Sequence, residues 1–233
     1  MNLRPEAFVQ VRAILFDVDG TLFSSEEIIH DIYIAEFSAA KERLGRPANI
    51  PTKPEVLDQI GKPVPIIFSN LAPDLTRAEQ DDVSDRVLKR LVSTILGGGG
   101  HHYEGVRETL HELKARGYAL YTASNGREPY VRSILTANQI LGTFAGLPVI
   151  QGNVQNKTQL VTRFLEDQKI KPEEVALIGD RTSDRDAAIE NGVPFIACRF
   201  GHGNEKEWEG AAIVVDSIRD LLDLFRIPSG IAG

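Results

Sequence analysis

Four short, uninterrupted apolar segments, each ending abruptly in polar residues, constrain the fold of this chain more than any other feature. They cover residues 13–16, 118–123, 175–178 and 195–198. Apolar runs of this length without polar alternation are typical of strands that are buried on both faces, as in a parallel sheet. A weaker fifth run covers residues 147–150. We therefore expect a parallel sheet that is covered on both sides.

Segments with helical periodicity separate these apolar runs. Their apolar stripes fall within residues 104–116, 131–135, 160–165 and 187–189. Strands that alternate with helices indicate right-handed crossover connections between neighbouring parallel strands. The predicted fold class is therefore α/β, built on a parallel sheet.

One long segment, residues 25–96, interrupts this alternation. Its periodicity predicts helices only, over residues 26–44, 54–60 and 77–96. Thr76 and Glu79 are spaced as a capping box at the start of the last of these helices, and a run of four glycines follows it at 97–100. We expect two domains: a core of residues 1–24 and 97–233, and an all-helical cap domain of residues 25–96 inserted after the first strand.

Composition excludes several classes of protein. The chain has 26 Lys and Arg against 33 Asp and Glu, a net charge of −7, which argues against nucleic acid as a partner. Cys198 is the only cysteine and lies within an apolar run, so we expect no internal disulfide and an inert core thiol. No apolar stretch is long enough for a membrane helix, and Arg4 and Glu6 do not fit a signal peptide. We expect a cytoplasmic monomer or homodimer that does not bind membranes.

Polar residues that end the predicted strands are the candidates for function. They are Asp17 and Asp19, Ser124 and Asn125, and Asp180 with Asp184 just beyond it. The carboxyl ends of parallel strands meet at one edge of a sheet, where ligands bind. Carboxylates so close together repel each other unless a cation lies between them, and an all-oxygen set favours Mg²⁺. Lys157 adds a positive charge suited to a phosphoryl oxygen.

Two acids separated by one residue suit a particular chemistry. An aspartate beside Mg²⁺ can act as a nucleophile and form an aspartyl-phosphate that water then hydrolyses. A second acid two residues later can protonate the leaving oxygen and then activate water. Gly20, next to the pair Asp17 and Asp19, allows the close backbone approach that a phosphate site needs.

With these residues, the sequence resembles the haloacid dehalogenase superfamily of phosphohydrolases. Residues 17–22 match its DxDGT motif, Ser124 its second motif, Lys157 its third, and residues 179–184 its fourth, GDxxxD, all in the family's order. The stretch from Tyr103 to Asn125 is similar to the phosphoglycolate phosphatase-like branch, which carries a helical cap after the first motif. The resemblance spans nearly the whole chain and implies a Rossmann-like core.

The resemblance also implies a role for each matched residue. Asp17 would be the nucleophile and Asp19 the general acid and base. Substrate would be bound by Thr21, Ser124, Asn125 and Lys157, and Mg²⁺ by Asp17, the Asp19 backbone carbonyl and Asp180, with Asp184 in or beside its coordination sphere. The implied activity is Mg²⁺-dependent hydrolysis of a small organic phosphate monoester through an aspartyl-phosphate. The implied partner is therefore a small phosphorylated metabolite.

Other functions share parts of this pattern. A β-phosphoglucomutase-like phosphotransferase has the same core motifs, and a phosphonoacetaldehyde hydrolase-like enzyme would need a Schiff-base lysine from the cap, for which Lys53 and Lys62 are candidates. Asp19 argues against a 2-haloacid dehalogenase. A non-catalytic receiver-like phospho-acceptor module is disfavoured by the helical insertion. The chain also has Ser24-Ser25 where close relatives often have Asp-Ser.

Two histidine positions remain. His101 and His102 follow the glycine run, and we expect them to lie on a loop, where adjacent side chains point apart, so we expect a solvated hinge and not a metal pair. His202 lies in the loop after the run at 195–198 and is a candidate to face the site.

Overall fold

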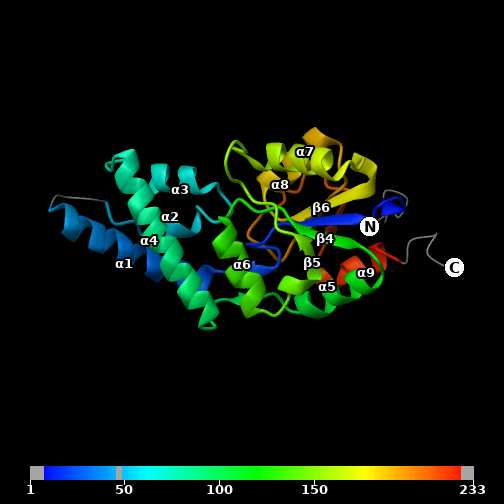
Figure 1. Cartoon of the computed structure of the whole chain (residues 1–233), viewed down its shortest axis with the longest axis horizontal. Helices are drawn as coiled ribbons and strands as arrows, with labels where there is room; N and C mark the ends of the chain where they lie inside the picture. Colours follow the sequence, from blue (N-terminus) through cyan, green and yellow to red (C-terminus); the bar gives the residue numbers. More distant parts are fainter. Residues whose placement is uncertain (1–7, 46–48, 227–233) are drawn as a thin grey trace.

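A six-stranded parallel sheet lies between layers of helices in the computed structural model, and a block of four helices lies beyond one end of it (Figure 1). The structure describes residues 8–45 and 49–226, so the N-terminal residues used in the signal-peptide argument fall outside it. The strands of the sheet are β1 (Ala13–Phe16), β4 (Ala119–Thr122), β5 (Phe144–Gly146), β6 (Val175–Gly179), β7 (Phe195–Cys198) and β8 (Ile213–Val215). Their spatial order is β5-β4-β1-β6-β7-β8.

Alternating residues of the central strand β1 enter two different cores. Ile14 and Phe16 pack with the face covered by α5 (Val106–Ala115), α6 (Glu128–Ala137) and α9 (Leu221–Leu224). Ala13 and Leu15 pack with the opposite face, covered by α7 (Lys157–Gln168) and α8 (Thr182–Asn191). Burial on both sides explains why the strand is apolar at every position. Short 3-10 helices at Leu141–Thr143, Pro172–Glu174 and Ile218–Asp220 complete the connections.

The four strong apolar runs are confirmed as β1, β4, β6 and β7. The weak fifth prediction, residues 147–150, is wrong: the strand there is β5, three residues earlier, and Val149 forms only an isolated bridge with Ser124. Pro148 has no N–H to donate to a neighbouring strand, which accounts for the break. Strand β8 was not predicted, because it is a short edge strand whose residues are partly exposed.

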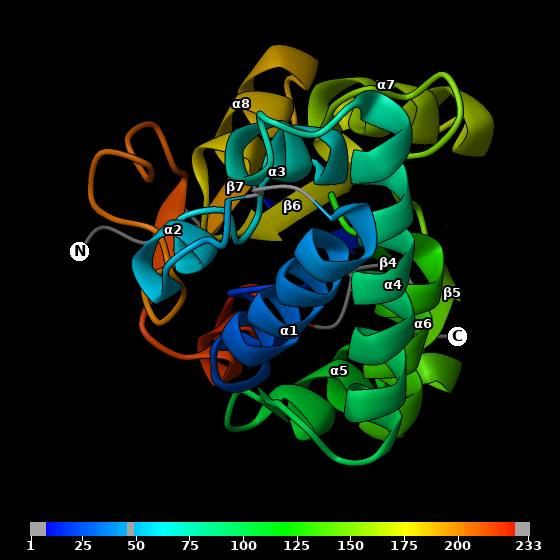
Figure 2. The ribbon, with the colours of Figure 1, turned by 90° about the vertical axis from the view of Figure 1, so that its left-hand side faces the viewer.

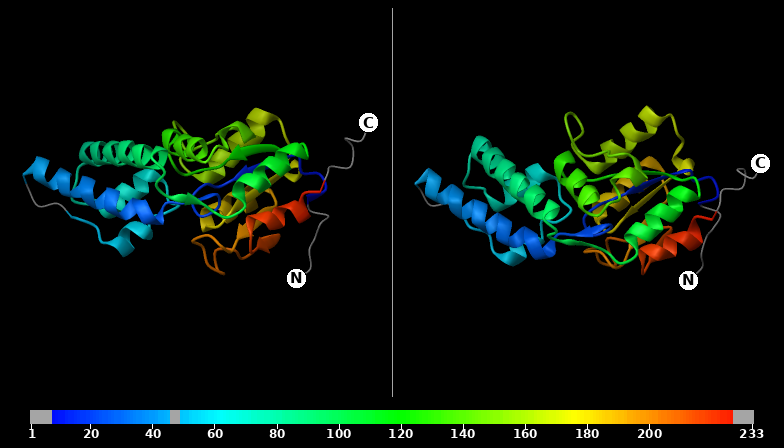
Figure 3. Two further views of the ribbon diagram at one scale, coloured as in Figure 1. Left: turned by 90° about the horizontal axis from the view of Figure 1, so that it is seen from below. Right: turned by 60° about the horizontal axis from the view of Figure 1, so that its bottom comes forward.

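The helical insertion consists of α1 (Glu26–Leu44), α2 (Lys53–Leu57), α3 (Val64–Leu71) and α4 (Arg77–Leu96). It lies in front of the sheet end in Figure 2 and beyond the sheet in both views of Figure 3. Helix α4 packs on α1 and also on α6 of the core. The predicted capping box is present, with the Thr76 backbone N–H donating to Glu79 Oε2 at 2.7 Å. Helix α3 was not predicted, although Pro63 and Pro65 mark its start.

The insertion joins the core through a two-stranded antiparallel ladder of β2 (Phe23–Ser24) and β3 (His101–His102). The expectation that His101 and His102 lie on a loop is therefore wrong, although the pair is largely solvated. Gly100 has a φ of +70°, and a Cβ there would lie 2.9 Å from Cε1 of Phe23. Glycine at this position thus lets the chain pass close to the ring. None of the helices in the described ranges is long and apolar enough to cross a membrane.

Candidate active site

The candidate site lies at the carboxyl ends of β1, β4 and β6, below the helical insertion. Asp17 follows β1, Ser124 lies two residues after β4, and Asp180 follows β6. One carboxylate oxygen from each of Asp17, Asp180 and Asp184 lies within 4.8 Å of the others, and all three residues are buried. The structure thus brings Asp17 together with two acids that lie more than 160 positions later in the sequence.

Lys157, the first residue of α7, lies between two of these acids. Its Nζ is 2.7 Å from Asp17 Oδ1 and 2.5 Å from Asp184 Oδ1, and its side chain is 1% exposed. Burial opposes the charge of Lys157, but the two carboxylates outweigh it and raise the pKa of the ammonium group. The side chain is therefore a fixed cation inside the site and not a solvated surface lysine.

Asp180 is held from several sides. Its Oδ2 accepts the backbone N–H of His202 at 2.7 Å, and its backbone oxygen accepts the indole N–H of Trp208 at 3.0 Å. The Thr21 hydroxyl donates to Oδ1 at 3.5 Å. Burial and the neighbouring Asp184 raise the pKa of Asp180 to about 7. Its surroundings therefore fix the carboxylate but do not fully compensate its charge.

The same imbalance affects Asp17. Burial raises the pKa of Asp17 well above its ordinary value, Lys157 lowers it, and the charges of Asp184 and Asp180 raise it further. Three buried carboxylates share one ammonium group, so an added divalent cation would balance the charge. All the donors are oxygens, which suits a hard cation such as Mg²⁺. The residues present therefore fit a divalent metal site.

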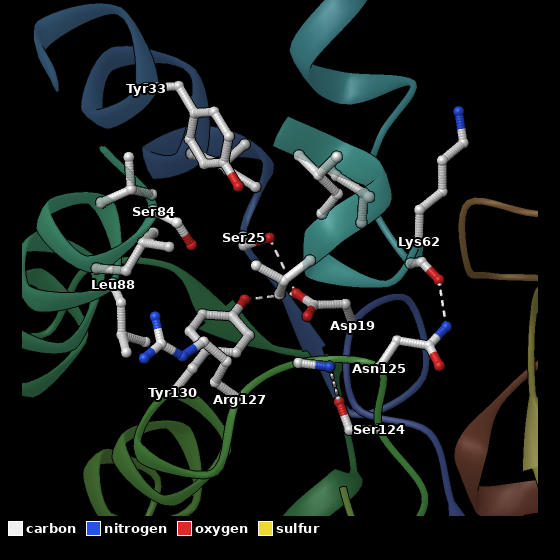
Figure 4. A pocket seen from close by; sticks show the side chains of 18 of the residues that line it. Asp19, Ser25, Tyr33, Lys62, Ser84, Leu88, Ser124, Asn125, Arg127 and Tyr130 are labelled. Carbon is white, nitrogen blue, oxygen red and sulfur yellow. Dashed lines mark hydrogen bonds between the residues drawn. The ribbon is translucent and has the colours of Figure 1, made fainter. Parts of the chain in front are cut away.

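Asp19 lies in a different environment from Asp17. Its Oδ1 accepts hydrogen bonds from the hydroxyls of Tyr130 at 2.7 Å and Ser25 at 2.9 Å (Figure 4). Burial raises the pKa of Asp19, and these two hydrogen bonds lower it. The Asp19 carboxylate does not belong to the three-acid cluster, and the metal contact predicted for this residue is its backbone carbonyl.

Sequence reasoning missed Tyr130 and Ser25. Ser25 belongs to the Ser24-Ser25 pair, where close relatives often have Asp-Ser. That comparison points to these two positions, but it draws attention to the absent aspartate and not to the serine hydroxyl. Tyr130 lies in the first turn of α6, 111 positions from Asp19, and only the fold brings the two together. Burial and the nearby Asp19 raise the pKa of Tyr130 well above its ordinary value, so its hydroxyl is a neutral donor.

Ser124 and Asn125 connect the core side of the site to the insertion. The Ser124 hydroxyl accepts the backbone N–H of Gly126 at 3.0 Å. Asn125 Nδ2 donates to the backbone oxygen of Gly61 at 2.6 Å, and its Oδ1 is buried without a hydrogen-bond partner in the described part of the chain. Asn125 therefore ties the loop between α2 and α3 to the end of β4.

A pocket extends from Asp17, Asp19 and Ser124 into the insertion. Lys62 lines it, but its Nζ is 2.7 Å from Asp58 Oδ2 and points away from Asp19 (Figure 4). Lys53 is exposed at the start of α2. Neither lysine candidate thus directs its amine at the acids.

His202 lies next to Asp180, as its position after β7 suggested. Its ring is 2.8 Å from Glu26 Oε1, at the start of α1, while its backbone N–H binds Asp180. His202 therefore contacts both the insertion and the acid cluster.

Cys198 is fully buried, as expected, and burial raises the pKa of its thiol well above the ordinary value.

Comparison with known proteins decides which family has this arrangement. Residues 14–198 match the haloacid dehalogenase-like hydrolases. The chain belongs to this family. The phosphoglycolate phosphatase of Shigella boydii serotype 4 is 26% identical over 247 residues, covering 95% of each chain, and that of Vibrio vulnificus strain CMCP6 is 26% identical over 92% of this chain and 96% of its own.

Two solved structures have the same fold as this chain. A predicted phosphoglycolate phosphatase from Haemophilus somnus 129PT superposes with a TM-score of 0.79 at 20% identity, over 93% of this chain and 99% of its own. CbbY from Rhodobacter sphaeroides, in complex with xylulose-(1,5)-bisphosphate, gives 0.74 at 21% identity, over 91% and 96%. The predicted fold class, a parallel α/β core with a helical insertion, is confirmed.

The buried lysine generates a prediction on stability. Lys157→Met should lower the free energy of unfolding in metal-free buffer by about 3–5 kcal/mol, because Asp17 and Asp184 would stay buried without a cation. Denaturant titration in the presence of EDTA measures this. Lys62→Met, in an exposed ion pair with Asp58, is the control and should cost less than about 1 kcal/mol. Equal losses for the two variants would contradict the assignment.

Proposed function

We propose that this hydrolase is a Mg²⁺-dependent phosphatase that cleaves a small organic phosphate monoester through an aspartyl-phosphate on Asp17. One observation carries the proposal: Asp17 lies against the buried ammonium of Lys157 within the acid cluster, and a second acid, Asp19, lies beside it in a separate environment. The phosphoglycolate phosphatases among the relatives support the same reaction class.

In the first step, an Asp17 carboxylate oxygen attacks phosphorus and the bond between phosphorus and the ester oxygen breaks. Asp19 gives its proton to that oxygen, which leaves as an alcohol. Lys157, 2.7 Å from Asp17 Oδ1, keeps the nucleophile oriented and offsets charge on the phosphoryl oxygens. The Ser124 hydroxyl is the second group that binds the phosphoryl oxygens.

In the second step, water attacks the phosphorus of the aspartyl-phosphate, and its proton passes to Asp19. The bond between phosphorus and the Asp17 oxygen breaks, which releases phosphate and restores both acids. The hydroxyls of Tyr130 and Ser25 hold Asp19 Oδ1 in both steps, so they act as positioning residues for the acid and base.

Asp17, the Asp19 backbone carbonyl and Asp180 would hold Mg²⁺, with Asp184 in or beside its coordination sphere. The cation would supply positive charge that stabilises the phosphoryl group in transfer. Thr21 would help to hold the Asp180 carboxylate through its hydrogen bond. Asn125 would join the core side of the site to the insertion through its contact with Gly61.

Two alternatives remain distinguishable. A phosphonoacetaldehyde hydrolase-like reaction requires a lysine amine that faces the acids. The ion pair of Lys62 with Asp58 therefore disfavours this alternative. A β-phosphoglucomutase-like phosphotransferase would use the same core residues but return the phosphoryl group to a sugar, so it releases an isomer and not inorganic phosphate.

The two acids should respond differently to substitution. Asp17→Asn should remove turnover and the covalent intermediate, which rapid-quench experiments with ³²P-labelled substrate detect. Asp19→Asn should lower kcat/KM for alkyl phosphates by about 10² to 10⁴-fold. It should lower kcat/KM much less for 2,4-dinitrophenyl phosphate, because that leaving group needs no proton. Normal turnover of Asp17→Asn would refute the covalent mechanism.

Tyr130→Phe should give a weaker form of the Asp19 defect. Loss of its hydrogen bond to Asp19 should reduce kcat/KM for alkyl phosphates by about 10- to 100-fold, with little change for 2,4-dinitrophenyl phosphate. Tyr118→Phe removes a hydroxyl that binds the Arg226 backbone and is the matched control. An equal loss with both leaving groups would mean that Tyr130 does not act through Asp19.

Metal removal gives a further prediction. Activity should disappear in EDTA and return with Mg²⁺, while Ca²⁺ should inhibit because it takes more ligands in looser geometry. Isothermal titration should show Mg²⁺ binding that Asp180→Asn weakens. Full activity in chelated, metal-free enzyme would rule out the metal.

We also propose that residues 25–96 form a separate domain that moves as a body and closes over the site. The aspartyl-phosphate mimic BeF₃⁻, added with Mg²⁺, should slow amide hydrogen exchange around Gly61 and Gly126, where the insertion meets the core, and leave β1 and β6 unchanged. Asp17→Asn is the control and should show no response. Identical exchange with and without BeF₃⁻ in the unmodified enzyme would contradict the motion.

A further inference from the structure

The wall of the pocket opposite the two catalytic acids is apolar. Helices α1, α3 and α4 supply it, with Ile29, Tyr33, Ile67, Phe68, Val87 and Leu91. Each of these residues is at most 8% exposed, and the rings of Tyr33 and Phe68 are stacked with centroids 5.7 Å apart. The wall is therefore preformed by packing within the insertion.

Polar groups on this wall are few and neutral. Figure 4 shows the hydroxyls of Tyr33 and Ser84 directed toward the space above Asp19, with Leu88 beside Ser84. Burial and the charge of Asp19 raise the pKa of the Tyr33 hydroxyl. These groups can bind a hydroxyl or carbonyl oxygen, but they offer no charge to an anion.

The cations at this pocket are already paired. Lys62 and Arg127 are the only ones among the described residues that line it. Lys62 binds Asp58 and points away from the acids (Figure 4), and Arg127 Nη1 is 2.6 Å from Asp85 Oδ1. A carboxylate on the ester group of a substrate would therefore find, among the described residues that line the pocket, no cation without a carboxylate partner. It would also lie against the buried apolar side chains of the wall, where a charge without a partner is costly.

We propose that the preferred substrate carries an uncharged, predominantly apolar ester group. This inference rests on the proposed phosphatase function and concerns only the part of the substrate that leaves with the ester oxygen. The substrate preference of this enzyme would then differ from that of the relatives named phosphoglycolate phosphatase, because the ester group of phosphoglycolate is an anion. The phosphoryl group itself binds at Lys157 and Ser124, outside the apolar wall.

The test compares kcat/KM of the Mg²⁺-loaded enzyme for substrates matched in size. Isobutyl phosphate and phosphoglycolate have nearly the same shape, and we expect isobutyl phosphate to be preferred at least tenfold. From methyl to butyl phosphate, kcat/KM should rise by about fourfold per methylene until the wall is filled. A flat alkyl series, or phosphoglycolate turned over as well as isobutyl phosphate, would overturn the proposal.

A charge variant tests the wall directly. Leu88→Lys places an amine at the edge of the pocket on α4 and should shift the ratio of isobutyl phosphate to phosphoglycolate toward phosphoglycolate by tenfold or more. Leu96→Lys, on an exposed position of the same helix, should leave the ratio unchanged. An unshifted ratio in a folded Leu88→Lys enzyme would contradict the placement of the ester group.

The two proposals fail in different ways. If no phosphate ester is hydrolysed, or if Asp17→Asn hydrolyses the esters normally, the proposed function is wrong. If phosphate is released in an Asp17-dependent reaction but phosphoglycolate is preferred, only the inference about the ester group is wrong. If Leu88→Lys does not fold, the alkyl series on the unmodified enzyme still decides the question.

Discussion

The buried ion pair of Lys157 with Asp17 and Asp184 is the contact on which the rest of the site depends. Removing three carboxylates and an ammonium from water is costly, so the fold tolerates them only in close, hydrogen-bonded geometry. The loop that follows β1 supplies Asp17, α8 supplies Asp184, and the start of α7 supplies the lysine. The relative position of these three elements is thus fixed at the place where the chemistry is proposed, and the remaining negative charge favours a divalent cation there.

Much of this arrangement could be predicted from sequence, for a physical reason. Strands buried on both faces must be apolar throughout, so their ends are visible as sudden changes of polarity, and in a parallel sheet those ends meet at one edge. Asp17, Ser124 and Asp180 were found in this way. Strand β8 and helix α3 escaped detection because a partly exposed edge strand and an eight-residue helix leave weak periodicity. The contact of Tyr130 with Asp19 depends on how α6 packs, which no local pattern encodes.

Asp17 and Asp19 illustrate how one loop can give two acids different properties. Asp17 faces a fixed ammonium and two other carboxylates, while Asp19 faces the neutral hydroxyls of Tyr130 and Ser25. A nucleophile must be charged and unprotonated, whereas a general acid must hold a proton when the ester bond breaks. Separate partners would let the two side chains meet the opposite demands of their proposed roles only two residues apart. The different environments of Asp17 and Asp19 come from their neighbours and not from the DxD motif itself.

The insertion contacts the core through groups that adjoin the acids. Asn125, next to Ser124, binds Gly61, while His202 binds Asp180 through its backbone and Glu26 through its ring. A shift of the insertion would therefore disturb the contacts of Asn125 and His202, which adjoin Ser124 and Asp180. Because the same insertion supplies the apolar wall, the proposed ester group would, by packing against this wall, favour the arrangement in which Asn125 and His202 keep both contacts. The proposed recognition of the ester group and the proposed alignment of the two acids would in this way depend on one interface.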